Sequence, residues 1–100
     1  MKTVEELIHE INEEELCSPH YVEENIDLDG AVEVDTVDLD EHRWYVLGTV
    51  VYKMGDRFLG IRGPVSRKSE ETEFSDIGIV CEAFEMVAIP SVTYKRKPTK

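Results

Sequence analysis

The sequence contains no apolar run long enough to cross a membrane. No stretch without a charged residue exceeds nine residues, the length of the one from Trp44 to Tyr52, whereas a membrane-spanning helix needs about 20. The first ten residues contain three acids and no apolar core, which is unlike a secretory signal or an Arg-rich transit peptide. We therefore expect a cytoplasmic protein without a membrane partner.

Cysteine is scarce as well. Cys17 and Cys81 lie 64 residues apart and form no CxxC pair, and the three histidines share no ligand spacing. The spacing gives no support to a metal centre or a redox motif. We expect two reduced, partly buried thiols, and neither a metal nor a cofactor.

Catalytic signatures are absent too. No serine lies in a G-x-S-x-G context, and the stretch Gly60 to Pro64 lacks the G-x-x-x-x-G-K-[ST] pattern of a phosphate loop. A site assembled only in three dimensions escapes a search of this kind. The sequence thus favours a non-enzymatic protein and identifies no catalytic residue.

Positive charge is almost missing from the first 42 residues. They hold fifteen acids and one base, Lys2, which sums to −14, whereas the rest of the chain sums to +3 and the whole to −11. An asymmetry of this kind bears on partners rather than on fold.

Two short helices are predicted before residue 26. Thr3 and Glu6 match a capping box, and apolar residues then recur at helical spacing, so the first helix should end near Glu13 or Glu14. Ser18-Pro19 resembles an N-cap followed by proline at the first helical position, which predicts a second helix through about Asn25. In this helix we expect Tyr21 and Val22 to be buried.

From Val32 onward the apolar residues alternate with acids, as in a strand. The alternation slips by one residue, which predicts a β-bulge or strand break near Asp35-Thr36. Residues 40–42 should form a polar turn into a strand over residues 43–54.

A β-hairpin should follow. Gly55-Asp56 fits a two-residue turn, with a return strand over residues 57–62. The implied register places Tyr52 opposite Leu59 and Val50 opposite Ile61.

The remaining chain is predicted to hold a loop and two strands. Gly63-Pro64 should end the return strand and open a long polar loop over residues 65–76. A last strand pair, residues 80–89 and 91–97, is broken at Pro90. The expected fold class is α+β: one or two N-terminal helices packed on an antiparallel sheet of about five strands. Residues 1–100 should form a single domain, helical over 1–26 and β-rich over 30–97.

The acids of the first half are the leading functional signal. We expect a non-enzymatic module whose acidic face binds a basic surface, in the first place that of a nucleic-acid-binding protein. Glu33 and Asp35, on one side of a strand, would lie about 6.6 Å apart, close to two phosphate steps of a nucleic acid. The expected face comprises Glu6, Glu10, Glu13, Asp27, Asp29, Glu33 and Asp35.

In size, acidity and lack of catalytic motifs the chain is similar to the DNA-mimic inhibitors that phages and mobile elements direct at defence enzymes. Three alternatives stay open. The acids could serve solubility or be neutralised by the basic C-terminal half. The sheet could be the interface of a structural or adaptor subunit. A ligand or nucleotide could bind the 62–76 loop through Arg62, Arg67 and Lys68. Direct nucleic-acid binding is disfavoured by the charge of −11.

Overall fold

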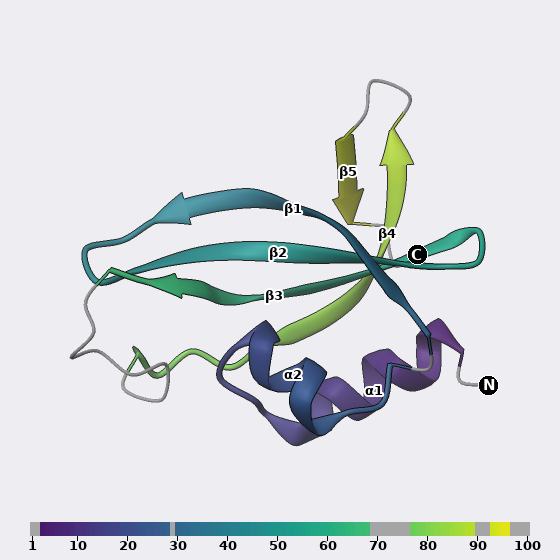
Figure 1. Cartoon of the computed structure of the whole chain (residues 1–100), viewed down its shortest axis with the longest axis horizontal. Coiled ribbons are helices and arrows are strands. Elements are labelled where there is room, and N and C mark those ends of the chain that lie inside the picture. The colour runs from purple at the N-terminus through teal and green to yellow at the C-terminus, as the bar shows by residue number, and fades with distance from the viewer. Residues whose placement is uncertain (1–2, 29, 69–76, 90–92, 97–100) are drawn as a thin grey trace.

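The computed structural model describes residues 3–28, 30–68, 77–89 and 93–96 (Figure 1). Two N-terminal helices precede an antiparallel sheet whose strands lie in chain order, which confirms the α+β class. The elements are α1 (Val4–Glu14), α2 (Pro19–Asn25), β1 (Val32–Glu41), β2 (Tyr45–Met54), β3 (Arg57–Arg67), β4 (Glu82–Ile89) and β5 (Thr93–Arg96). Strands β1 to β4 form the body of the sheet, and β5 pairs with the half of β4 that extends past β3. In the described residues, no helix has the length and apolar character needed to cross a membrane.

Both helices begin where the sequence predicts. Thr3 and Glu6 form the complete capping box of α1, each side chain accepting a hydrogen bond from the other residue's backbone amide. Glu15 ends α1 in the left-handed conformation, with φ of 52°. Ser18 caps α2 and Pro19 occupies its first turn, where a missing amide hydrogen costs nothing.

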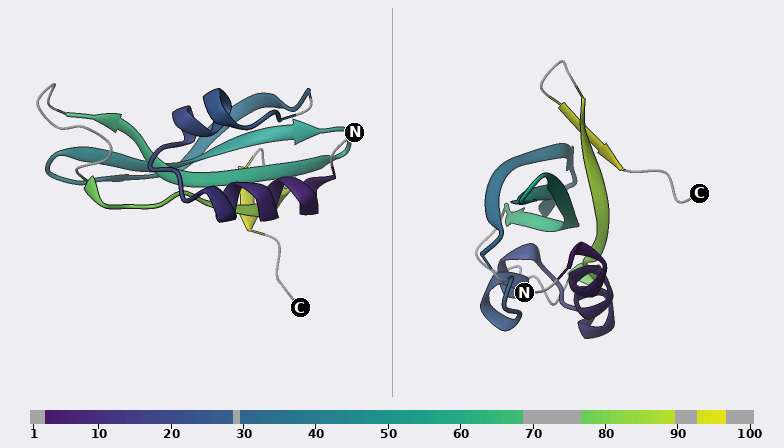
Figure 2. Two further views of the ribbon diagram at one scale, coloured as in Figure 1. Left: turned by 90° about the horizontal axis from the view of Figure 1, so that it is seen from below. Right: turned by 90° about the vertical axis from the view of Figure 1, so that its right-hand side faces the viewer.

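The main core lies between the helices and one face of the sheet. Figure 2 shows α1 and α2 on the same side of the strands, with α1 against β4. Tyr21 is only half-buried, whereas Val22 is fully buried as expected. The buried residues of this core are Val4, Leu7, Ile11, Val22, Ile26, Val50, Tyr52, Leu59, Ile61, Cys81 and Ala83.

The β2–β3 hairpin has the predicted register. Tyr52 lies opposite Leu59 and Val50 opposite Ile61. Gly55 has φ of 66°, and the following Asp56 is not among the residues with positive φ. This combination fits a type II′ turn rather than type I′, which requires positive φ at both positions.

The expectation that β3 ends at Gly63-Pro64 is wrong. The strand continues to Arg67, with Gly63 opposite Gly48 and Pro64 opposite Leu47. The register shifts next to this point, between Val46 and Leu47, and an irregularity of this kind accommodates a proline that cannot donate to the ladder. Only the first part of the predicted 65–76 loop is described, and Pro90 lies outside the described residues.

The predicted slip in β1 exists, at two places rather than one. The pairing with β2 is irregular between Glu33 and Asp35 and again between Val37 and Asp40. Asp38 has φ of 54°, which lets the strand take up the second irregularity. The strand therefore continues to Glu41. The turn lies at residues 42–44 instead of the expected 40–42, and β2 begins at Tyr45 instead of residue 43.

The face of the sheet away from the helices is also packed. Val51 lies between two core residues along β2, so its side chain points to this second face, where it is fully buried. Met86 is buried there too, against Gly60 of the neighbouring strand. A methyl group at Gly60 would lie 2.5 Å from the Met86 sulfur and 2.8 Å from a Phe84 ring carbon.

Helix α1 closes the outer edge of β4 where β5 does not cover it. The Asn12 side chain accepts a hydrogen bond from the Ala83 amide at 2.8 Å and donates one to the Ala83 carbonyl at 3.2 Å. The Cys81 amide donates to the Leu16 carbonyl at 2.7 Å. These contacts satisfy backbone groups that would otherwise be available to another strand.

The Asn12→Asp variant tests this closure. We expect the free energy of unfolding to fall by about 1–2 kcal/mol at pH 7, because the carboxylate has no donor for the Ala83 carbonyl. The deficit should shrink as the pH falls to about 4, where a protonated carboxyl regains a donor. Urea unfolding at pH 7 and at about pH 4 measures this deficit. Asn12→Ala, which loses both bonds at any pH, is the control, and equal pH profiles would contradict the assignment.

Candidate protein-interaction surface

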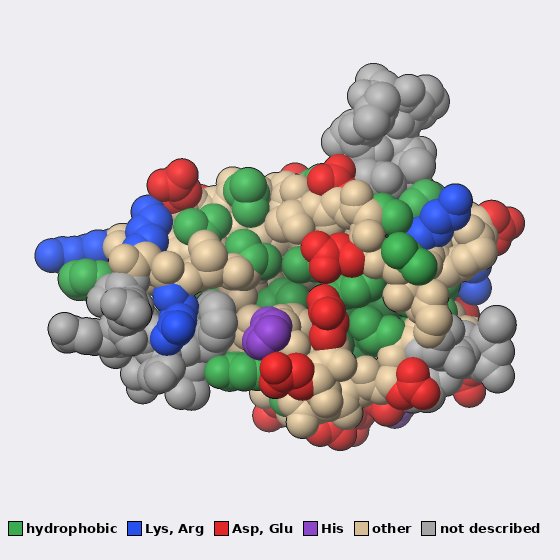
Figure 3. Space-filling view, viewed as in Figure 1, with side chains coloured by type: hydrophobic (Ala, Val, Ile, Leu, Met, Phe, Trp, Pro, Cys, Tyr) green, Lys and Arg blue, Asp and Glu red, His purple; other side chains and the backbone are tan. Residues whose placement is uncertain are grey.

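Strand β1 forms one edge of the sheet. It pairs with β2 alone, and none of its ten residues is buried. Three large apolar side chains are exposed on it: Val32 at 61%, Val34 at 43% and Leu39 at 62%. In the space-filling view, hydrophobic and acidic side chains lie next to one another on the face that β1 crosses (Figure 3).

Trp44 extends this apolar surface into the turn after β1. Half of its surface is exposed, and the Arg43 guanidinium lies 4.8 Å from the ring centroid, a cation–π arrangement. We call residues 32–44 the β1 surface.

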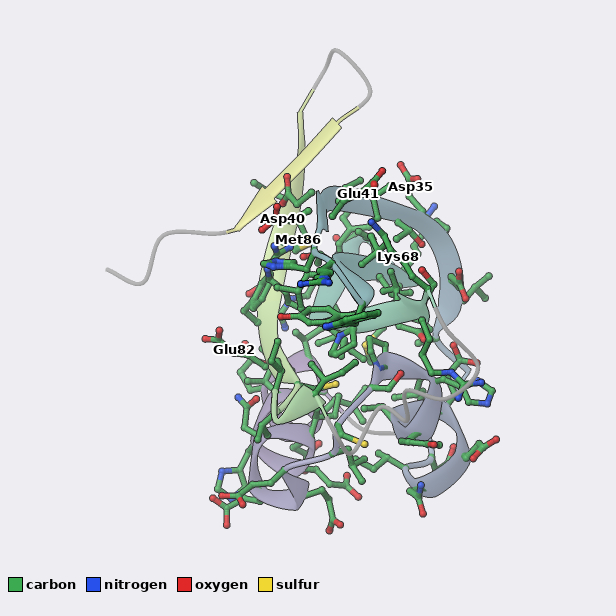
Figure 4. All side chains as sticks on the ribbon, turned by 90° about the vertical axis from the view of Figure 1, so that its left-hand side faces the viewer. Asp35, Asp40, Glu41, Lys68, Glu82 and Met86 are labelled. Atoms are coloured by element: carbon green, nitrogen blue, oxygen red, sulfur yellow. The ribbon has the colours of Figure 1, made fainter. Side chains whose placement is uncertain are left out.

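The β1 surface carries five acids: Glu33, Asp35, Asp38, Asp40 and Glu41. Near its end, Lys68 pairs with Glu41 at 3.1 Å and His42 with Asp40 at 3.1 Å. In the part of the chain that the structure describes, Glu33 and Asp38 have no cationic partner. Figure 4 shows Asp35 and Glu41 pointing outward from β1. The surface is thus both apolar and negative.

The predicted acidic face is divided. Glu6, Glu10 and Glu13 belong to α1, which packs against β4, whereas Glu33 and Asp35 belong to β1 at the opposite edge. Asp27 is exposed at the end of the α2 segment, and Asp29 lies outside the described residues. The acids of α1 and those of β1 therefore do not form one continuous surface.

The expected spacing of Glu33 and Asp35 is wrong. The register shift between them places Glu33 opposite Tyr52 and Asp35 opposite Val51. Tyr52 and Val51 are consecutive, and consecutive side chains point to opposite faces of a sheet. The two carboxylates thus do not lie side by side like neighbouring phosphates.

Two parts of the β1 surface were missed from the sequence. Asp40 and Glu41 were predicted to lie in a turn, Asp38 was not counted in the acidic face, and the exposure of Leu39 was not expected. A signal for them was present: Val32 and Leu39 have opposite parity along one strand, so without a bulge they cannot both face the core.

The residues of the alternative ligand site do not converge. Arg62 donates to the Asp38 carbonyl at 2.9 Å and to the Thr49 hydroxyl at 3.1 Å. Arg67 lies five positions further along β3, a separation of about 16 Å in an extended chain. Lys68 is paired with Glu41. This geometry does not gather the three cations around one anion.

A partly buried hydrogen bond lies near the start of the β1 surface. The Tyr52 hydroxyl donates to the Glu23 carboxylate of α2. Burial, followed by this bond to an acid, raises the pKa of Tyr52 far above its usual value. The bond ties α2 to β2, which is a structural role. No group of three metal-ligating side chains occurs among the described residues.

These features define a small α+β protein with an acidic, partly apolar sheet edge. No family model matches the chain, and neither the curated proteins nor the solved structures include a match. Any function must accordingly be argued from the β1 surface itself.

Proposed function

We propose that this protein is a non-enzymatic binding module that presents its β1 surface to a basic surface of another protein. The observation that carries the proposal is the exposure of Val32, Leu39 and Trp44 among acids on a single edge strand and the turn that follows it. Clustered apolar exposure of this kind is typical of interaction sites. An apolar centre with a charged rim is also the usual composition of a protein interface.

Charge supports a basic partner. The acids of the β1 surface belong to the half of the chain that sums to −14, and negative potential speeds the encounter with a positive surface. Internal neutralisation accounts for some acids elsewhere: Arg57 bridges Glu5 of α1 and Glu85 of β4, at 2.5 and 3.0 Å. Among the described residues, neither this bridge nor another ion pair involves Glu33 or Asp38.

In its narrower form, the proposal makes the partner a cytoplasmic nucleic-acid-binding enzyme and this protein its inhibitor, of the anti-defence type. The presence of fifteen acids among the first 42 residues supports this form. Because Glu33 and Asp35 do not repeat the phosphate spacing, mimicry would depend on the local potential rather than on a regular row of charges.

The triple variant Glu33→Gln, Asp38→Asn, Asp40→Asn tests the proposal. We expect partners captured from a lysate of the source cells at low salt to bind this variant roughly tenfold more weakly. The matched control removes three charges from α1, through Glu10→Gln, Glu13→Gln and Glu14→Gln, and should bind like wild type. Capture at low and high salt, with titration of each purified partner, provides the measurement.

Equal loss in both variants would contradict a role specific to the β1 surface. Binding that survives molar salt and the triple variant, yet fails in Trp44→Ala, would favour an adaptor that binds through apolar contacts. The exposed Trp44 is the observation that favours this second candidate.

A further inference from the structure

The connection between α1 and α2 lies beside the segment that leads into β4 (Figure 1), and a backbone hydrogen bond joins the two next to the cysteines. The Leu16 carbonyl accepts the Cys81 amide hydrogen at 2.7 Å. The Ser18 hydroxyl donates to the Pro64 carbonyl at 3.0 Å. Cys17 lies between these two anchored residues, so its place next to Cys81 is fixed by hydrogen bonds on both sides.

The hydrogen bond limits the distance between the cysteines. Because Cys17 directly follows the accepting carbonyl, standard bond lengths put the two Cα atoms at most about 7 Å apart. Disulfides usually span about 4.4–6.8 Å between Cα atoms. The two residues thus lie within or close to bridging range, although the sequence separates them by 64 positions.

The Cys81 sulfur points toward this connection. It lies 2.7 Å from the place where a side chain at Gly63 would begin, and Pro19 Cδ lies 3.1 Å from the same place. Gly63 therefore leaves the space in which the sulfur meets the segment that follows Cys17. A larger residue at this position would fill that space.

The two thiols differ in accessibility. Cys81 is 3% exposed, whereas Cys17 is half-buried and reaches solvent. Burial, together with the nearby Cys17, raises the pKa of Cys81 to about 12, so Cys81 stays protonated near neutral pH. Because the thiolate is the reactive form, an oxidant should react with Cys17 first.

We propose that Cys17 and Cys81 form a disulfide when the protein meets a peroxide, with Cys17 as the attacking residue and Cys81 as the resolving residue. The Cys17 thiolate attacks one peroxide oxygen, the O–O bond breaks, and a sulfenic acid and hydroxide result. The Cys81 sulfur then attacks the Cys17 sulfur as the Cys81 proton passes to the sulfenic hydroxyl, the S–O bond breaks, and water leaves. Two thiols lose two electrons, and hydrogen peroxide is reduced to two waters.

This bond would attach the α1–α2 connection covalently to the start of β4. It would close a long ring in the chain, which restricts the unfolded state. We expect the oxidised protein to melt higher by on the order of 10 °C. The bond would also hold α1 over the edge of β4 that Asn12 closes. Disulfides in reducing compartments are typically transient or redox-sensing.

Hydrogen peroxide applied to the full chain tests the proposal. Wild type should lose about 2 Da and yield a peptide pair linked through Cys17 and Cys81. Cys81→Ala should accumulate a sulfenic acid on Cys17 that dimedone labels, whereas Cys17→Ala should leave Cys81 unlabelled. Circular dichroism checks that both variants fold. Two results would overturn the proposal. One is oxidation of Cys17 to sulfinic acid in wild type without a linked peptide. The other is dimedone labelling of Cys81 in Cys17→Ala.

Discussion

Raising the pH above 9 should destabilise this protein strongly. The cause is the burial of the Cys81 thiol and the Tyr52 hydroxyl in the helix-facing core. Their pKa values lie above the usual 9.0 and 10.0. For Cys81 the folded value is about 12, chiefly because burial disfavours the thiolate. For Tyr52 burial acts first and the hydrogen bond to Glu23 second.

The direction of the effect follows from proton binding. Above pH 9 the unfolded chain releases the Cys81 proton while the folded protein keeps it, so the unfolded state binds fewer protons and stability falls. At 1.36 kcal/mol per pKa unit, the difference for Cys81 amounts to about 4 kcal/mol by pH 12. Tyr52 adds its own loss above pH 10. Below pH 9 the contribution of both groups is fully present.

Urea unfolding between pH 8 and pH 11 measures this loss, and two variants separate its sources. Cys81→Ala should remove the part that begins near pH 9, and Tyr52→Phe the part that begins near pH 10. If both variants kept the wild-type profile, the burial of these two groups would not be the cause.

Gly60→Ala should lower the free energy of unfolding by about 2–3 kcal/mol, because no room exists for a methyl group. The new Cβ would lie 2.5 Å from the Met86 sulfur, 2.7 Å from Met86 Cγ and 2.8 Å from Phe84 Cε1. Val51, which lies opposite Gly60 in the β2–β3 pair, and Met86 are both buried, so little free space surrounds this position.

A double-mutant cycle with Met86→Ala tests this packing. Met86→Ala alone should cost about 2–5 kcal/mol through the cavity that it opens. The double variant should cost less than the sum, since the methyl group that Gly60→Ala introduces occupies space that Met86 has left. Chemical denaturation of the four proteins provides the energies. Additive costs, within about 0.5 kcal/mol, would show that the two positions do not share this space.

The parts of the fold that the sequence predicted depend on local signals. The Thr3 capping box, the Ser18-Pro19 helix start and the Gly55-Asp56 turn each involve residues at most three positions apart. Their geometry is determined by those residues alone, which is why both helices and the hairpin register were correct. The β4–β5 pair was also expected, within a few residues at each end.

The parts that the sequence did not predict depend on distant residues. Gly63-Pro64 resembles a strand end, yet pairing with Gly48 and Leu47 keeps it in the sheet. The division of the acids between two edges follows from the packing of α1 on β4, which local patterns do not contain. The meeting of Cys17 with Cys81 has the same origin, since a backbone bond between segments 65 residues apart creates it.

The contact of Asn12 with Ala83 joins residues 71 positions apart, and this bears on how the chain is made. On the ribosome, α1 emerges early, with an apolar stripe of Val4, Leu7 and Ile11 whose counterpart on β4 is not yet synthesised. Neighbouring strands can pair as each leaves the exit tunnel, since every pairing joins consecutive strands. We therefore expect the first-made helix to dock last, so that a nascent chain stalled before β4 would be the form most exposed to chaperones and proteases.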